Sequence, residues 1–282
     1  VQVRTVSLHP DAAVLRLEGE VQGLAFSCGC NPRQIYLSPY EGAANVVYEN
    51  AANLACTGAD PLCIVNCLNF ASPVHGDIYW QLSESVRGMG DMARAIGVPV
   101  VGGNVSLYNE SDEMRTRIKP TPSIGMVGRV SVTHPVKPEP GMNLAIYGQE
   151  EAHFGGSVLD AVFSCGGSPP PKADPAILET IRSLVISDRG IAVTDISEGG
   201  LAAALATFVP GARVNLADPA LPSLLSETYG RFLVAYRDES SLRGFGCRTI
   251  GEVTSGGLEI RYPGGQVSLS EDQVEYALSS FT

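Results

Sequence analysis

The sequence has no apolar run approaching the roughly 20 residues that a helix needs to cross a bilayer, and it is short of basic residues. Nineteen lysines and arginines stand against 30 aspartates and glutamates, which gives a formal net charge of −11 at pH 7. Nucleic acids and membrane surfaces attract basic faces, so we expect neither as a partner. A local pocket for a phosphorylated small molecule is compatible with this charge.

Histidine is scarce too, with only four residues, which are scattered along the chain. Zinc sites combine closely spaced Cys or His pairs, a spacing that Cys28, Cys30, Cys63 and Cys67 do not follow, so zinc is not expected. The seven cysteines are odd in number and a chain of 282 residues needs no disulfides, so we expect reduced thiols and a cytoplasmic location. Val1 at the start, with no signal-like segment, suggests a fragment or a processed product.

Composition and proline placement predict a folded chain of two domains. Charged residues make up 17% and apolar residues 44%, which excludes a disordered chain, and the length suits about two domains. Residues 134–141 hold three prolines, and neither a helix nor a central strand continues through such a segment. We therefore expect an amino-terminal domain at 1–136 and a carboxy-terminal domain at 137–282.

Hydrophobic periodicity predicts strands and helices in both domains. Ser38, Pro39 and Glu41 have the spacing of a capping box at the start of a helix that ends near Gly58. In the first domain we expect strands at 13–17, 24–26, 62–65, 99–101 and 123–132, and helices at 38–58 and 79–97. In the second we expect strands at 144–147, 191–194, 231–236, 249–253, 258–262 and 266–269, and helices at 177–187, 201–208 and 272–279. This mixture without a strict βαβ rhythm is typical of an α+β fold.

The most informative segment is Val100–Glu110, where a strand runs into Gly102 and Gly103. Glycines let backbone amides approach a phosphate, and successive amides can form an anion nest. Asn104 and Ser106 then offer neutral oxygens to a cation or a hydroxyl. A structural turn with a polar cap is the alternative interpretation, and the residues alone favour it about as strongly as they favour a binding site.

Three further segments place polar residues beside expected elements. Asn66 and Asn69 end a strand, where ligands often lie, although their amides can also satisfy loop backbone. Asp195–Gly200 precedes a helix, whose amino terminus is either capped or open to a phosphate. Arg231, after a polar loop, either contacts an anion or lies along the surface.

These segments together resemble the phosphoribosylformylglycinamidine synthase family, and specifically the carboxy-terminal half of its synthetase component. The most specific run is GGNVSLYNE at 102–110, and PTPSIGMVG at 120–128 supports it. Further matches, in the family's order, lie at 37–42, 59–62, 67–70 and 195–201. The wider superfamily includes aminoimidazole ribonucleotide synthetase and selenophosphate synthetase, which lack this set.

The resemblance implies a reaction and a fold. Such enzymes use ATP and Mg²⁺ to phosphorylate the amide oxygen of formylglycinamide ribonucleotide, and ammonia from glutamine then displaces the phosphate. Each half of the synthetase has a domain whose sheet pairs with its twin, followed by an α/β domain. The implied partners are the amino-terminal half and a glutaminase subunit or domain. For this chain alone we expect a homodimer through an apolar face around Val14–Leu17 and Leu24–Phe26.

The resemblance also assigns roles by position. Gly103 and Asn66 match ATP contacts, Asn104 a magnesium ligand and Ser106 a contact to the ribonucleotide. Asn66 and Gly29 stand where many members carry aspartate.

No residue matches the family's catalytic histidine, so we expect no catalytic residue in this chain and no activity from it alone. Two alternatives stay open. The first is a non-catalytic half that binds nucleotide and braces a partner. The second is a stand-alone ATPase, for which Glu110 and Asp112 are the only nearby carboxylates.

Overall fold

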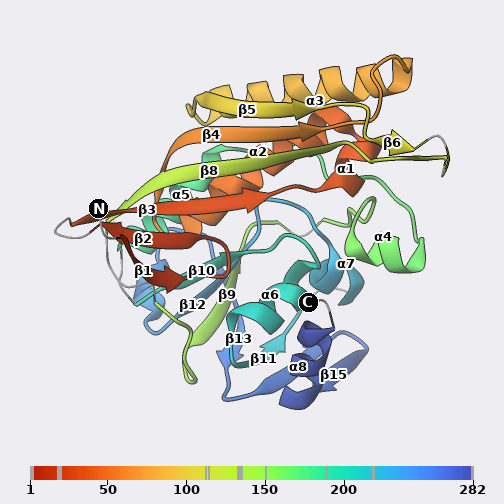
Figure 1. Cartoon of the computed structure of the whole chain (residues 1–282). Coiled ribbons are helices and arrows are strands. Elements are labelled where there is room, and N and C mark those ends of the chain that lie inside the picture. Colours follow the sequence, from red (N-terminus) through yellow and green to blue (C-terminus); the bar gives the residue numbers. More distant parts are fainter. Residues whose placement is uncertain are drawn as a thin grey trace.

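The computed structural model describes residues 3–17, 21–111, 113, 115–131, 136–149, 151–187, 190–217 and 220–280. Its strands form two large sheets and one short two-stranded ribbon, with the first sheet above the second in the view of Figure 1. Each sheet draws its strands from one part of the chain, before residue 132 or after residue 142. Helices lie on both sheets, in agreement with the expected α+β class.

The first sheet has the strand order β1-β2-β3-β8-β4-β5. All neighbouring strands are antiparallel except β4 and β5, which run parallel and place β5 at an edge. The strands are β1 (Val3–Leu8), β2 (Ala13–Leu17), β3 (Gln22–Gly29), β4 (Asp60–Asn69), β5 (Val100–Ser106) and β8 (Thr121–Ser131). β6 (Glu110–Ser111) and β7 (Thr116–Arg117) form the short ribbon beyond β5.

The second sheet has the order β10-β12-β9-β13-β11-β14-β15 and is antiparallel except for the β11/β14 pair. The strands are β9 (Asn143–Tyr147), β10 (Ala192–Asp195), β11 (Gly211–Asn215), β12 (Phe232–Tyr236), β13 (Arg248–Val253), β14 (Gly257–Tyr262) and β15 (Gly265–Leu269). β12 is buried on both faces: Phe232 and Val234 join one core, whereas Leu233 and Ala235 join another. The second sheet is therefore covered on both sides.

The helices are α1 (Pro32–Leu37), α2 (Pro39–Cys56), α3 (Gly76–Ala95), α4 (Val158–Phe163), α5 (Ala176–Ser187), α6 (Gly200–Phe208), α7 (Ala220–Leu225) and α8 (Glu271–Ser279), with a 3-10 turn at Glu239–Leu242. α2 is the central one, because it packs on β3 and β8 on one side and on α5 and β10 on the other. Fourteen of its 18 residues are buried, so it lies enclosed on most sides, and its sequence is rich in small residues and lacks the separate polar face of an amphipathic surface helix.

Most expected elements form within a few residues of their predicted bounds, and three expectations fail. Ser38 does not cap α2, because its hydroxyl donates to the Glu41 carboxylate instead of receiving a backbone N–H. Gly102 and Gly103 continue β5 rather than turning, so no anion nest forms there. The apolar face expected around Val14–Leu17 and Leu24–Phe26 is largely covered, because Val14 is only 3% exposed and Leu24 and Phe26 are half-buried. The exposed apolar side chains of this sheet belong to β4 and β5: Leu62, Val65, Val100, Val101 and Val105.

Candidate functional site

The parallel pairing of β4 and β5 brings the four residues singled out in the sequence together. Asn66 lies opposite Gly103, and Cys67 lies opposite Asn104. Asn69 lies opposite Ser106, where both strands end. Because β5 is the edge strand, Gly103 and Asn104 are exposed and Ser106 is half-buried.

The four residues divide between the two faces of the sheet, since neighbouring side chains in a strand alternate. Asn66 shares its face with the buried Ile64 and Leu68, and it lies over Gly103. A Cβ built on Gly103 would stand 2.0 Å from Asn66 Oδ1 and 2.7 Å from the Asn66 carbonyl oxygen. Position 103 therefore requires glycine for this close approach of the two strands, whereas nothing lies within 4 Å of a Cβ on Gly102.

Asn104 points to the opposite face. Its Nδ2 lies 3.8 Å from Cys67 Sγ, and Cys67 in turn contacts the Asn69 side chain. Asn69 Nδ2 also donates to the carbonyl oxygens of Cys67 and Thr121, each at 3.2 Å. Asn69 is thus engaged with backbone, as the alternative interpretation of that segment expected, while Asn104 Oδ1 projects from an exposed side chain.

The turn after β5 is tied to the end of β4. Phe70 N donates to Ser106 O at 3.0 Å, and Asn109 N donates to Phe70 O at 3.1 Å. Between them Tyr108 has φ 64°, a left-handed backbone conformation that is rare outside glycine. Ser106 therefore sits in a turn whose backbone is fixed on both sides.

Glu110 closes this end of the sheet. Its carboxylate accepts the Ser72 N–H at 3.3 Å and lies 3.8 Å from His75 Nε2 and 3.6 Å from Arg117 Nε. Asp112, the other carboxylate expected here, lies outside the described residues. Glu110 is thus committed to holding two loops together.

The fit of a magnesium ion to these residues is incomplete. Mg²⁺ in proteins is usually held by one or two carboxylates together with substrate phosphates. On the face of Asn104, the described strand residues supply amide, hydroxyl and thiol groups, and Glu110 already has three neighbours. Within the described ranges no three Asp, Glu, His or Cys side chains gather as a metal site would require. Asn104 could add one neutral oxygen to a cation, but this chain's described residues do not form a complete cation site.

A second polar cluster lies between the sheets, and sequence reasoning did not bring its members together; Gln34 and Glu227 in it are buried, whereas Glu49 and Asp195 are half-buried. We name Gln34, Glu49, Asp195 and Glu227 the buried carboxylate cluster. Burial, together with the nearby Asp195, Glu198 and Glu227 carboxylates, raises the pKa of Glu49 to about 8. Burial also raises the pKa of Asp195 to about 6.

Glu227 is the hub of that cluster and is only 1% exposed. Its carboxylate accepts the Val158 N–H at 2.8 Å, the Gly199 N–H at 2.9 Å and Gln34 Nε2 at 3.4 Å. Burial raises its pKa, and the two amides act in the opposite direction. Of the two alternatives that the sequence left, a capped or an open start of α6, the structure has an engaged one, but the carboxylate comes from Glu227 of a distant loop.

Arg231 is structural. It is 1% exposed and donates to the backbone oxygens of Ser226 and Ser223 at 3.1 and 2.9 Å. The sequence had suggested an anion contact or a surface position. The burial of a charged group against carbonyl oxygens could not be read from local pattern.

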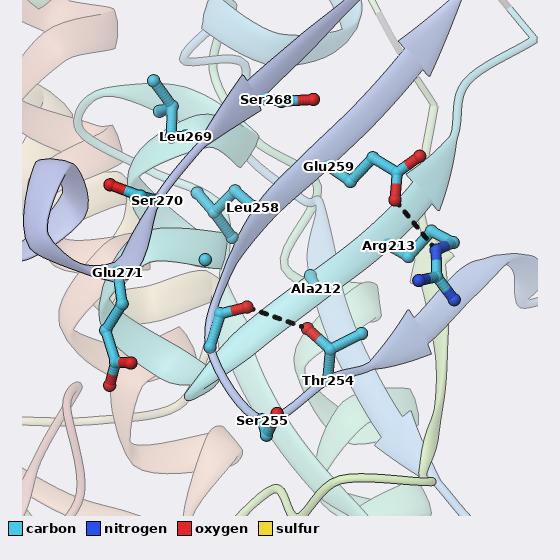
Figure 2. Close-up of a pocket in the computed structure, with 12 residues that line it drawn as sticks. Ala212, Arg213, Thr254, Ser255, Leu258, Glu259, Ser268, Leu269, Ser270 and Glu271 are labelled. Atoms are coloured by element: carbon cyan, nitrogen blue, oxygen red, sulfur yellow. Dashed lines mark hydrogen bonds and ion pairs between the residues drawn. The ribbon is translucent and has the colours of Figure 1, made fainter.

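A groove of about 580 Å³ lies far along the chain from these residues, on the second sheet. Figure 2 shows Glu271 directed away from the ion pair of Arg213 and Glu259, with Thr254 hydrogen bonded to the Gly256 backbone. The lining of the groove comes from β11, β14, β15 and the loops beside them, and it includes none of the residues singled out in the sequence.

The described residues contain no helix long and apolar enough to cross a membrane.

Comparison with known proteins shows what the chain is similar to. The family described as "AIR synthase related protein, N-terminal domain" matches residues 9–130. The phosphoribosylformylglycinamidine synthase subunits PurL of Methanosarcina barkeri and Methanosarcina acetivorans are 42% and 39% identical to this chain over its whole length. The chain spans 42% of the length of each of these relatives.

Solved structures share the fold at lower identity. Thermotoga maritima PurL complexed with FGAR is 19% identical, with a TM-score of 0.74 over 97% of this chain and 48% of that one. The hydrogenase maturation protein HypE in complex with ATP is 21% identical, with a TM-score of 0.67 over 93% of this chain and 88% of that one. A chain of about this extent is thus nearly a whole protein in HypE and about half of one in PurL. Residues 9–130 are therefore similar to the AIR synthase related N-terminal domain, and the whole chain is similar to part of the phosphoribosylformylglycinamidine synthase subunit PurL.

Proposed function

We propose that this chain is the carboxy-terminal half of a phosphoribosylformylglycinamidine synthase. The whole enzyme would be an ATP-dependent ligase of purine biosynthesis that converts formylglycinamide ribonucleotide into the amidine with ammonia from glutamine. The observation that carries the proposal is the identity of 39–42% to PurL subunits along the entire chain. The meeting of Asn66, Gly103, Asn104 and Ser106 on adjacent strands supports it.

The proposed reaction needs a better leaving group than an amide oxygen, and phosphorylation of that oxygen by ATP provides one. Phosphoryl transfer depends on positioned charge around the moving group, and Mg²⁺ would supply positive charge there when bound. This chain's contribution is positional. Gly103 would contact ATP through the backbone of the edge strand, with Asn66 packed over it. Asn104 would offer an amide oxygen to a cation, and Ser106 a hydroxyl to the ribonucleotide.

The proposed partners follow from what this chain lacks. Its described residues hold no complete cation site, and no residue of it matches the family's catalytic histidine. We therefore propose that the amino-terminal half completes the active site and that a glutaminase delivers ammonia in the cytoplasm. In the absence of that half, the exposed apolar residues of β4 and β5 would favour a homodimer.

Complementation tests the proposal. The chain is mixed with a separately produced amino-terminal half, and ADP release is followed with formylglycinamide ribonucleotide, ATP, Mg²⁺ and ammonia. We expect release from the mixture and none from either half alone. Substantial ribonucleotide-dependent release from this chain alone would instead identify a stand-alone ATPase. ATP binding with no turnover in any mixture would identify a non-catalytic half.

A further inference from the structure

The side chain of Asn109 surrounds the hydroxyl of Ser106 at the end of β5. Asn109 Nδ2 lies 3.1 Å from Phe70 O, 2.9 Å from Ser106 O and 3.2 Å from Ser106 Oγ. Asn109 Oδ1 lies 3.4 Å from the same Oγ. One amide group therefore ties the end of β4, the end of β5 and the Ser106 hydroxyl together.

The orientation of this amide is fixed by its neighbours. Both carbonyl oxygens beside it are acceptors, so only the NH₂ group can face them, and a flipped amide would set oxygen against oxygen. The distance of 3.2 Å suits an N–H···O hydrogen bond, whereas 3.4 Å is long for O–H···O, which normally spans 2.5–3.0 Å. Ser106 Oγ thus shares the Asn109 NH₂ group with the two carbonyl oxygens, and its own proton makes only a long hydrogen bond to Asn109 Oδ1, which a nearer ligand oxygen could replace.

Backbone contacts hold Asn109 in place. Its N–H donates to Phe70 O, and its carbonyl oxygen accepts the Ile118 N–H at 3.0 Å. The residue before it, Tyr108, has the left-handed backbone with φ 64°. Such conformations persist where surrounding contacts impose them, and they concentrate at functional turns.

We infer that Asn109 is a positioning residue that presents the Ser106 hydroxyl as a hydrogen-bond donor to an oxygen-rich, anionic group of the ribonucleotide. This inference rests on the proposed function. A donor hydroxyl suits a phosphate or carbonyl oxygen of the ligand. Asn109 itself need not touch the ligand, since its amide acts through Ser106.

The decisive variant is Asn109→Asp. It preserves the shape of the side chain but replaces the NH₂ donor by a carboxylate oxygen that accepts the Ser106 proton and repels both carbonyls and an anionic ligand. In the complemented enzyme we expect KM for formylglycinamide ribonucleotide to rise about tenfold, the effect of roughly one charge-assisted hydrogen bond, with KM for ATP little changed. Asn109→Ala should raise it less. Asn215→Asp, at an exposed strand end in the second sheet, serves as the control.

A double variant separates positioning from folding. If Asn109 acts through Ser106, Asn109→Asp should add little to the ribonucleotide KM once Ser106→Ala is present. Additive effects, a KM equal to that of the control, or equal rises for both substrates would overturn the inference while the proposed function stands. A wild-type mixture that neither binds nor converts the ribonucleotide would overturn the proposed function, and the inference with it.

Discussion

At the ends of β4 and β5 the polar side chains lie near the surface and leave atoms without a partner. In the buried carboxylate cluster, by contrast, Glu227 lies out of water among protein donors, and Glu49 and Asp195 are half-buried. Asn104 is exposed and makes one weak contact with a thiol. Glu227 is enclosed and accepts three hydrogen bonds from separate segments. Polar groups whose hydrogen bonds are all made within the protein hold the fold together, whereas polar groups with atoms that lack a protein partner are available to a ligand.

The same contrast separates the two glycine-rich segments. Gly103 is extended and exposed on the edge strand, although Asn66 packs against one side of it. Gly199 adopts φ 78° at the start of α6, and its N–H is bound by Glu227. Two segments that read alike as phosphate sites are therefore different: one is open, and the other is occupied by the protein's own carboxylate.

Glu227→Ala should give the largest loss of stability. The substitution leaves the Val158 and Gly199 amides and Gln34 Nε2 buried without their acceptor, and we expect a loss of about 3 kcal/mol in the free energy of unfolding. Chemical denaturation measures it. Glu239→Ala, on an exposed turn, is the control, and Glu227→Gln should lose less because one acceptor oxygen remains. A loss below about 1 kcal/mol would mean that the cluster does not hold the fold.

Gly103→Ala comes next and tests the open segment. Its methyl group would overlap the Asn66 side chain and carbonyl oxygen, and we expect a loss of about 1–3 kcal/mol together with weaker ATP binding. Gly102→Ala, one residue away, meets open space and should stay within about 0.5 kcal/mol of the wild type. Equal losses at both positions, measured by denaturation and calorimetry, would contradict the close approach of β4 and β5.

Glu49→Gln should change how stability depends on pH. The pKa of Glu49 is about 8 in the folded protein, against an unperturbed value of 4.5. The folded state therefore favours the protonated carboxyl, and the stability that this gives is complete below pH 4.5 and is lost as the pH rises through 8. The variant cannot ionise, so its melting temperature should fall less between pH 5 and pH 8 than that of the wild type. In this variant the Asp195 carboxyl, whose pKa is about 6, still causes a smaller loss of stability as the pH rises. The exposed-site variant Glu239→Gln is the control. If the melting temperature of Glu49→Gln changes with pH as that of the wild type does, the Glu49 carboxyl is in contact with water and has no raised pKa.

Asn104→Ala should have the smallest effect on stability. The side chain is exposed and its contact to Cys67 is weak, so we expect a change within about 0.5 kcal/mol. Turnover of the complemented enzyme should nevertheless fall by at least about tenfold if its amide oxygen contributes to cation binding. A fall in stability without a fall in turnover would mean that Asn104 has a structural role and not a role in binding.

Several features of the site could be predicted from the sequence. The run at 102–110 carried the resemblance and marked the site but not the continuing edge strand, and the asparagines at 66 and 69 indicated the neighbouring strand end. Asn109 could have been suspected from the same run, but nothing in one sequence indicates that its amide folds back on Ser106. Glu49 and Glu227 carried no local signal, because they lie in an apolar helix and in a polar loop and meet only through packing.

The sequence by itself determined most local elements and the resemblance to a family, because periodicity, prolines and a specific motif act within a few residues of one another. Only the tertiary structure decided which face each polar residue occupies and which glycine segment stays open. Strand register sets Asn66 and Asn104 on opposite faces of the sheet. The packing of α2 between the sheets brings the carboxylates of distant segments together out of water, and burial then shifts their pKa values.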